Sequence, residues 1–245
     1  MQNTNTPLIG YAGSPTDYDT PSIELIGSGE GQQTQGWGLY FSLNPKDAFR
    51  YRDNYAKPTI QYGDEFFAVK WDFDYQFINK AGKRIPQNTP LYYLFTLMVE
   101  YKDSSVVIQY AENDAELAKY KNDLISGRIK INSGVVIKAG LPSPKFLLDR
   151  NLLLSNQSGF IKTAISNLIK DNGLKVKDIT GGRFYDGLQT VLNLTPKQCS
   201  LMLYDYGIRG LTYMGVLDGQ CAVVFSDKDI KIIEKFYGTY ENANI

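Results

Sequence analysis

The side chains that could do chemistry in this sequence do not include histidine, which occurs nowhere among its 245 residues. Its absence excludes Ser-His-Asp and Cys-His nucleophilic catalysis, and also histidine-ligated zinc or haem. The two cysteines, Cys199 and Cys221, are too few for a thiolate zinc site. They form no framework of spacings, so a reducing compartment is the simpler expectation. We therefore predict chemistry that needs neither a metal nor an imidazole.

A glycine-rich stretch is the clearest candidate for binding a ligand: IGSGEGQQTQGWG, residues 26–38. Glycine-rich loops hold phosphates with backbone N–H groups, but no Gly-Lys-Ser/Thr follows here, as a P-loop requires. A short strand rather than a helix comes next, which excludes the dinucleotide-binding fingerprint. On composition alone, a surface loop without a ligand is the simpler interpretation.

The elements that must position these residues are short strands mixed with helices. Strands are predicted at residues 8–12, 39–41, 134–138, 211–214, 222–225 and 230–233, and as a pair within 64–79. Helices are predicted after Asn44-Pro45, at 90–102, 111–127 and 159–172, and after Thr195-Pro196. This irregular order favours an α+β fold over a regular βαβ array.

Composition restricts the class of protein further. The apolar fraction is 43%, and 26 basic residues balance 26 acidic ones, as in a soluble globular protein. Zero net charge argues against broad electrostatic capture of nucleic acid. No window approaches the roughly 20 apolar residues of a membrane span, and the N-terminus has no secretory signal pattern. We expect a cytoplasmic protein without a membrane partner.

Several motifs in a fixed order resemble a known family. They are YAGSP (11–15), GSGEGQQTQGWGLYFS (27–42), a helix carrying Tyr51, GVVIKAGLP (134–142), LLDRNLLLSNQS (147–158), GGRFYDGL (181–188), YGIRGLTYM (206–214) and AVVFSDKDIKI (222–232). The string is similar to the ADP-ribosyltransferase superfamily, in the branch of diphtheria toxin and the poly(ADP-ribose) polymerases. It resembles above all the ADP-ribosyltransferase domains of phage and mobile-element polyvalent proteins. Residues 57–132 are not matched.

The resemblance implies a single domain over residues 1–245, an ADP-ribosyltransferase-like split β-sandwich with flanking helices and a helical insertion at about 57–132. It implies an NAD-dependent mono-ADP-ribosyltransferase, in which nicotinamide leaves C1′ and a nucleophile of a macromolecule replaces it. NAD would be the substrate and no metal is required. Neutral charge favours a protein acceptor over nucleic acid. Such a bacterial toxin or effector acts in its own cytoplasm or is delivered into a target cell's cytoplasm. The oligomeric state stays open.

The first motif implies part of an NAD site. By resemblance, Gly13 would clamp the nicotinamide amide with backbone groups, and Ser14 and Gly38 also match NAD-binding positions. Ala12 occupies the position of the family's histidine, and its methyl group cannot donate a hydrogen bond to ribose. Two explanations stay open: the natural site is degenerate, or a histidine has been replaced to silence the enzyme.

The remaining site residues follow from the same resemblance. Tyr40 matches the tyrosine that stacks on nicotinamide and Tyr51 a second aromatic wall, which suits a planar cation. Gln220 matches the third position of the triad, where an amide can bind the ribose 2′-hydroxyl but brings no charge. Glu30 is a candidate base for the acceptor. A non-catalytic NAD-binding or interaction module, or a structural component that merely retains the fold, are the alternatives.

Overall fold

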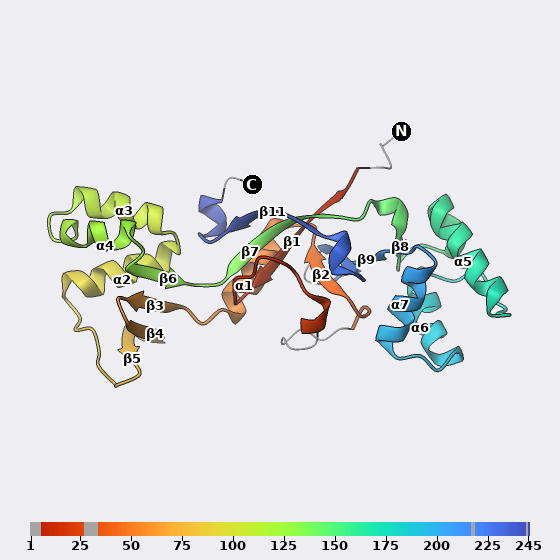
Figure 1. The fold of residues 1–245 in the computed structure, drawn as a ribbon, viewed down its shortest axis with the longest axis horizontal. Helices are drawn as coiled ribbons and strands as arrows, with labels where there is room; N and C mark the ends of the chain where they lie inside the picture. Colours follow the sequence, from red (N-terminus) through yellow and green to blue (C-terminus); the bar gives the residue numbers. More distant parts are fainter. Residues whose placement is uncertain (1–5, 27–33, 217–218, 244) are drawn as a thin grey trace. The chain divides into compact units, whose positions relative to one another are not determined.

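The computed structural model describes residues 6–26, 34–216, 219–243 and 245. The chain divides into two compact units. The first comprises residues 1–12, 18–48 and 137–234, and the second comprises 13–17, 49–136 and 235–245. Each unit combines a sheet with helices (Figure 1), which confirms the α+β class. The unmatched segment 57–132 lies entirely within the second unit.

The first unit is built on a seven-stranded sheet with the order β11-β7-β1-β2-β10-β9-β8. Its strands are β1 (Leu8–Ser14), β2 (Leu39–Ser42), β7 (Val135–Leu141), β8 (Leu147–Asp149), β9 (Gly210–Gly215), β10 (Gly219–Val224) and β11 (Lys231–Phe236). Strand β10 is antiparallel to both β2 and β9, whereas β8 and β9 are parallel. The strands predicted in this part of the sequence are all present.

Three helices of the first unit group beside β8 and β9 (Figure 1). They are α5 (Gly159–Asp171), α6 (Gly181–Val191) and α7 (Pro196–Asp205), and their apolar faces form one core with the sheet. Helix α7 begins as predicted, with Thr195 and Gln198 in a reciprocal capping box. Helix α1 (Pro45–Tyr55) also begins as predicted, because the Asn44 side chain accepts from the Lys46 N–H.

Helix α6 was not predicted, because three glycines occur within it. The first of them has a structural role: a Cβ on Gly181 would lie 2.3 Å from the carbonyl oxygen of Asp149. Thr180 caps the helix by accepting from the Arg183 N–H. The glycine therefore allows the start of the helix to approach the end of β8.

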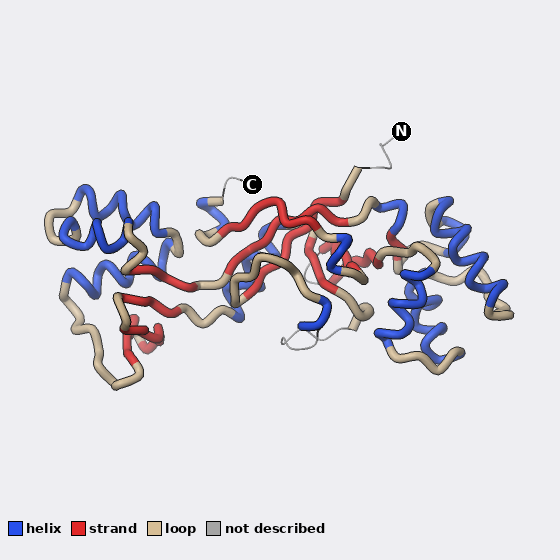
Figure 2. Tube along the Cα trace, in the orientation of Figure 1, coloured by secondary structure: helices blue, strands red, loops and turns tan. Residues whose placement is uncertain are grey.

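The second unit has a four-stranded sheet of order β5-β4-β3-β6, with strands β3 (Thr59–Tyr62), β4 (Glu65–Asp72), β5 (Asp74–Asn79) and β6 (Ile129–Asn132). Its helices are α2 (Pro90–Tyr101), α3 (Ser104–Asn113) and α4 (Lys121–Ile125), which gather near β6 (Figure 2). The strand pair within 64–79 and the helix at 90–102 are confirmed. The unit has its own core of apolar side chains.

The single helix predicted at 111–127 is wrong. Helix α3 ends at Asn113, and the Asp114 carboxylate accepts from the N–H groups of Glu116 and Leu117. That arrangement starts a new turn, and a short 3-10 helix then leads into α4. The 3-10 helices in the described part of the chain are Ile23–Leu25, Ala118–Tyr120, Pro144–Phe146, Leu154–Asn156, Asp227–Asp229 and Tyr240–Asn242. Within the described ranges, no helix is long and apolar enough to cross a membrane.

Candidate functional site

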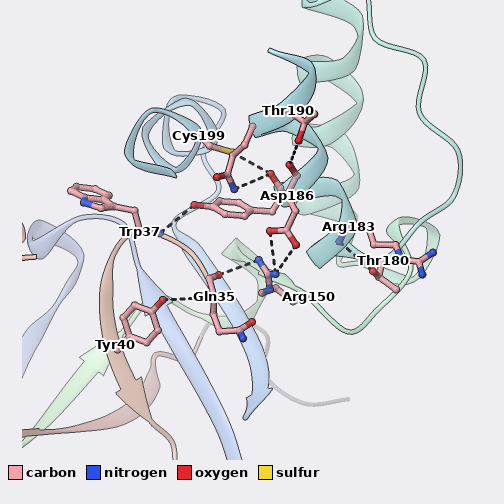
Figure 3. Close-up of polar contacts among 11 residues, drawn as sticks. Gln35, Trp37, Tyr40, Arg150, Thr180, Arg183, Asp186, Thr190 and Cys199 are labelled. Carbon is pink, nitrogen blue, oxygen red and sulfur yellow. Dashed lines mark hydrogen bonds and ion pairs between the residues drawn. The ribbon is translucent and has the colours of Figure 1, made fainter. Parts of the chain in front are cut away.

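The end of the glycine-rich stretch is held to the start of β2 by Tyr40 (Figure 3). The Gln35 N–H donates to the Tyr40 hydroxyl at 3.2 Å, and that hydroxyl donates to the Gly36 carbonyl at 2.7 Å. Burial raises the pKa of Tyr40 to about 12. The hydroxyl therefore keeps its proton at neutral pH and remains a hydrogen-bond donor.

Side chains of helices α6 and α7 hold the main chain of Trp37, near the end of the glycine-rich stretch. The Trp37 N–H donates to the hydroxyl of Tyr185 at 3.2 Å, and Ser200 Oγ donates to the Trp37 carbonyl at 2.8 Å. Tyr185 and Ser200 are both buried, and their hydroxyl oxygens lie 2.8 Å apart. Both main-chain groups of Trp37 are therefore satisfied by side chains far away in the sequence.

Arg150 fixes the same main chain from a third direction (Figure 3). Its guanidinium donates to the Gln35 carbonyl at 3.1 Å and forms an ion pair with Asp186 of α6 at 3.0 Å. Its side chain is only 12% exposed, and it lies over the ring of Tyr185. Gly36 between these contacts has φ +134°, and a Cβ there would lie 2.7 Å from Leu211.

Three motifs that are distant in the sequence thus meet at one place together with helix α7. The segments 35–40, 147–150 and 181–188 and helix α7 all contribute to the contacts around Gln35 and Trp37. We call this set the loop anchor, defined by Tyr40, Arg150, Tyr185, Asp186 and Ser200. It gives the glycine-rich stretch a fixed C-terminal end on the sheet of the first unit.

Tyr213 is the aromatic partner that the structure gives to Tyr40. The two ring centroids are 6.3 Å apart and the rings meet edge to face. The predicted second wall, Tyr51, belongs to the second unit, where its ring lies 4.5 Å from that of Tyr55. Sequence reasoning missed Tyr213, although it lies within a motif that carried the resemblance. The signal is its position in β9 opposite Cys221, on the face of the sheet that Tyr40 shares.

Gln220 does not lie on the face of the sheet that carries Tyr40. Tyr40 is opposite Val223 and Ser42 is opposite Cys221, so these four side chains share one face. Gln220 follows the other alternation and is exposed. We call the face of the sheet that carries these four side chains the Tyr40 face. The residue after Gln220, Cys221, lies on the Tyr40 face and is buried. Gln220 and Tyr40 thus lie on opposite faces of the sheet, and the role expected for Gln220 at the ribose 2′-hydroxyl stays a prediction.

Ala12 also lies on the opposite face. Tyr11 is the residue of β1 opposite Ser42, so Ala12 alternates to the other side. A Cβ on Gly10, two residues before Ala12, would lie 2.9 Å from Phe41 Cβ, which fits this assignment. The structure therefore does not bring Ala12 and Gln220 together with Tyr40.

The remaining predicted residues fall in three places. Gly13 and Ser14 belong to the second unit, where Ser14 Oγ donates to the Thr16 carbonyl. A Cβ on Gly38 would lie 2.5 Å from Val223 Cγ1 and 2.7 Å from the Val224 carbonyl oxygen. Glycine is thus required there for contact with β10, a structural reason besides any ligand. Glu30 lies outside the described residues.

One carboxylate adjoins the Tyr40 face and was not singled out in the sequence. Ser42 Oγ lies 3.5 Å from Oδ2 of Asp47, which is in the first turn of α1. Asp47 is partly exposed. Across the residues that the structure describes, no group of three or more cysteine, aspartate and glutamate side chains could hold a metal ion.

No family model, no curated protein and no solved structure matches this chain.

Proposed function

We propose that the chain is an NAD-dependent mono-ADP-ribosyltransferase, or a degenerate descendant that still binds NAD. The observation that carries the proposal is the loop anchor. Three of the motifs that carry the resemblance, 27–42, 147–158 and 181–188, converge with Ser200 of α7 on the main chain of Gln35 and Trp37. Segments that build one site are expected to meet in this way.

In this proposal nicotinamide lies against the Tyr40 face. The rings of Tyr40 and Tyr213 meet edge to face, and together they offer an aromatic surface to a planar pyridinium cation. As nicotinamide leaves C1′, positive charge develops on the ribose, which a carboxylate can stabilise. Asp47 offers such a carboxylate, because it accepts a hydrogen bond from Ser42, whose side chain is on this face.

A second candidate is an NAD-binding module without transferase activity. Ala12 and Gln220 favour it, because neither supplies a charge or an imidazole and both lie away from the Tyr40 face. Tyr40 also uses its hydroxyl within the loop anchor. These features are compatible with binding but remove two of the groups that the resemblance assigns to catalysis.

The test uses the full chain with NAD. Calorimetry should detect binding, and Tyr213→Ala should weaken it, whereas Tyr110→Ala, at a partly exposed tyrosine of the second unit outside the proposed site, is the matched control. Release of nicotinamide, or transfer of label from adenylate-labelled NAD to protein, should appear in the Ala12→His variant if a histidine has been replaced. Binding without release in both forms supports the module. No binding by a folded chain would refute both candidates.

A further inference from the structure

The tip of the β4–β5 hairpin in the second unit exposes a phenylalanine completely. Trp71 is opposite Tyr75 and Asp72 is opposite Asp74, so Phe73 alone forms the apex. Phe73 is 99% exposed. Contact of a whole phenyl ring with water is unfavourable, because burial of apolar surface stabilises proteins and their complexes. The protein gains nothing for its own fold from this ring.

Other aromatic side chains extend this apolar surface along the hairpin. Trp71 is 68% exposed, and its ring centroid lies 4.9 Å from that of Tyr75. Phe66 of β4 is also exposed (52%), but it is five positions from Trp71, so it lies on the other face of the hairpin and is not part of this surface. Single exposed apolar residues are common, but several on one hairpin indicate a surface that contacts a partner. Tryptophan is moreover among the residues that contribute most to interfaces.

A cavity of about 410 Å³ adjoins the hairpin in the same unit. Asp74 of the hairpin lines it, together with Tyr92 and Tyr93 of α2 and the carboxylates of Asp114 and Glu116. Two hydrogen bonds join the cavity wall to β5: Gln87 Nε2 donates to Asp74 Oδ2, and the Tyr92 hydroxyl donates to the Tyr75 carbonyl. The cavity and the hairpin tip are therefore parts of one surface.

The carboxylates of Asp74, Asp114 and Glu116 give this surface a negative charge. None of the ion pairs found in the described residues involves Asp72, Asp74, Asp114 or Glu116. Asp72 and Asp74 lie directly opposite each other, an arrangement that repels. A cationic partner would relieve that repulsion, whereas phosphate groups would increase it.

We infer that this surface docks a basic segment of a partner protein. An arginine or lysine side chain enters the cavity between the tyrosine rings and the carboxylates, where cation–π attraction and ion pairing act together. Trp71 and Phe73 cover the stem of that side chain and its apolar neighbours. Nucleic acid and anionic membranes are disfavoured by the same carboxylates. The inference does not depend on the proposed transferase activity.

The chain offers its own reporter for the test. It has two tryptophans, of which Trp37 is buried and Trp71 is exposed. We expect a short peptide of alternating arginine and alanine to change Trp71 fluorescence saturably in the full chain, and to protect it from acrylamide quenching. The Trp37→Phe variant, if folded, isolates the signal. A peptide of alternating glutamate and alanine should have no effect.

Variants separate a built site from general charge attraction. Glu116→Gln and Asp72→Asn should each weaken binding of the arginine peptide by about twofold to fivefold, the range of an exposed ion pair. Phe73→Ser should weaken it by about tenfold. Asp64→Asn removes the same charge from an exposed residue just before β4, at the other end of that strand, and is the matched control. The inference is overturned if this control weakens binding equally, if the arginine peptide does not bind, or if a single-stranded oligonucleotide binds better.

Discussion

The hydroxyl of Tyr185 in helix α6 accepts the hydrogen bond of the Trp37 amide at 3.2 Å. Trp37 precedes β2 by two residues, so a helix far along the chain sets where the glycine-rich stretch joins the sheet. Neither group faces water, since Trp37 and Tyr185 are both buried.

Tyr185→Phe should destabilise the protein by about 1–3 kcal/mol, because the buried Trp37 N–H loses its acceptor while the ring volume is kept. Urea unfolding followed by circular dichroism measures the change. Tyr206→Phe is the control: its hydroxyl donates to Asp171 at the surface, so its loss should matter little. Equal effects of the two substitutions would contradict a special role for Tyr185.

Arg150→Ala should speed amide hydrogen exchange at Gln35 and Trp37, because the Gln35 carbonyl loses its donor and Asp186 loses its ion partner. Exchange measured by mass spectrometry or NMR reports it directly. Arg150→Lys keeps the charge but cannot reach both partners with a planar fork, so we expect only partial protection. Unchanged exchange in Arg150→Ala would show that Tyr40 and Tyr185 suffice.

Gly38→Ala should destabilise the fold by about 1–3 kcal/mol or more, because the new methyl group meets the backbone of β10. Gly187→Ala is the matched control, since nothing lies within 4 Å of its added Cβ and it is within helix α6. That control should stabilise the protein by roughly 0.5–1 kcal/mol. Thermal unfolding of both variants tests the pair. A stable Gly38→Ala variant with lost NAD binding would instead assign the glycine to the ligand.

Because the pKa of Tyr40 is raised in the folded protein, the free energy of unfolding should change with pH in the alkaline range. Its pKa is about 12 in the folded protein against 10.0 ordinarily, so the contribution is complete below pH 10 and is lost as pH rises toward 12. Stability should therefore fall over this range partly through Tyr40, and less in Tyr40→Phe. The ultraviolet difference titration between the two proteins should show a phenol that ionises near pH 12. A difference curve centred near pH 10 would contradict the burial of this hydroxyl.

Much of the fold follows from local signals in the sequence. Asn44-Pro45 and Thr195-Pro196 predicted the starts of two helices, because capping depends on residues only three or four apart. The alternation in 64–79 likewise predicted β4 and β5. Helix α6 was missed because glycine is unfavourable in helices, and the contact of Gly181 with β8 that explains one of its glycines cannot be read locally.

The candidate site was harder to predict than the fold. Tyr40 could be proposed from its motif, but its neighbours depend on strand register. A difference of one residue between Gln220 and Cys221 changes the face of the sheet, and the sequence of β10 alone does not specify its alignment with β2. Tyr213 was missed for the same reason. The hydrogen bond from the Trp37 amide to the Tyr185 hydroxyl joins residues 148 positions apart, and no local sequence pattern can predict it.

The loop anchor holds the carbonyl of Gln35 and both main-chain groups of Trp37, and none of its contacts with Gln35 uses the side chain. Position 35 should therefore accept many amino acids in a saturation library selected for folding. Arg150, Tyr185 and Ser200 should accept few. Substitutions at position 35 of the glycine-rich stretch can thus change the side chain offered to a ligand without changing the main-chain geometry that the loop anchor fixes.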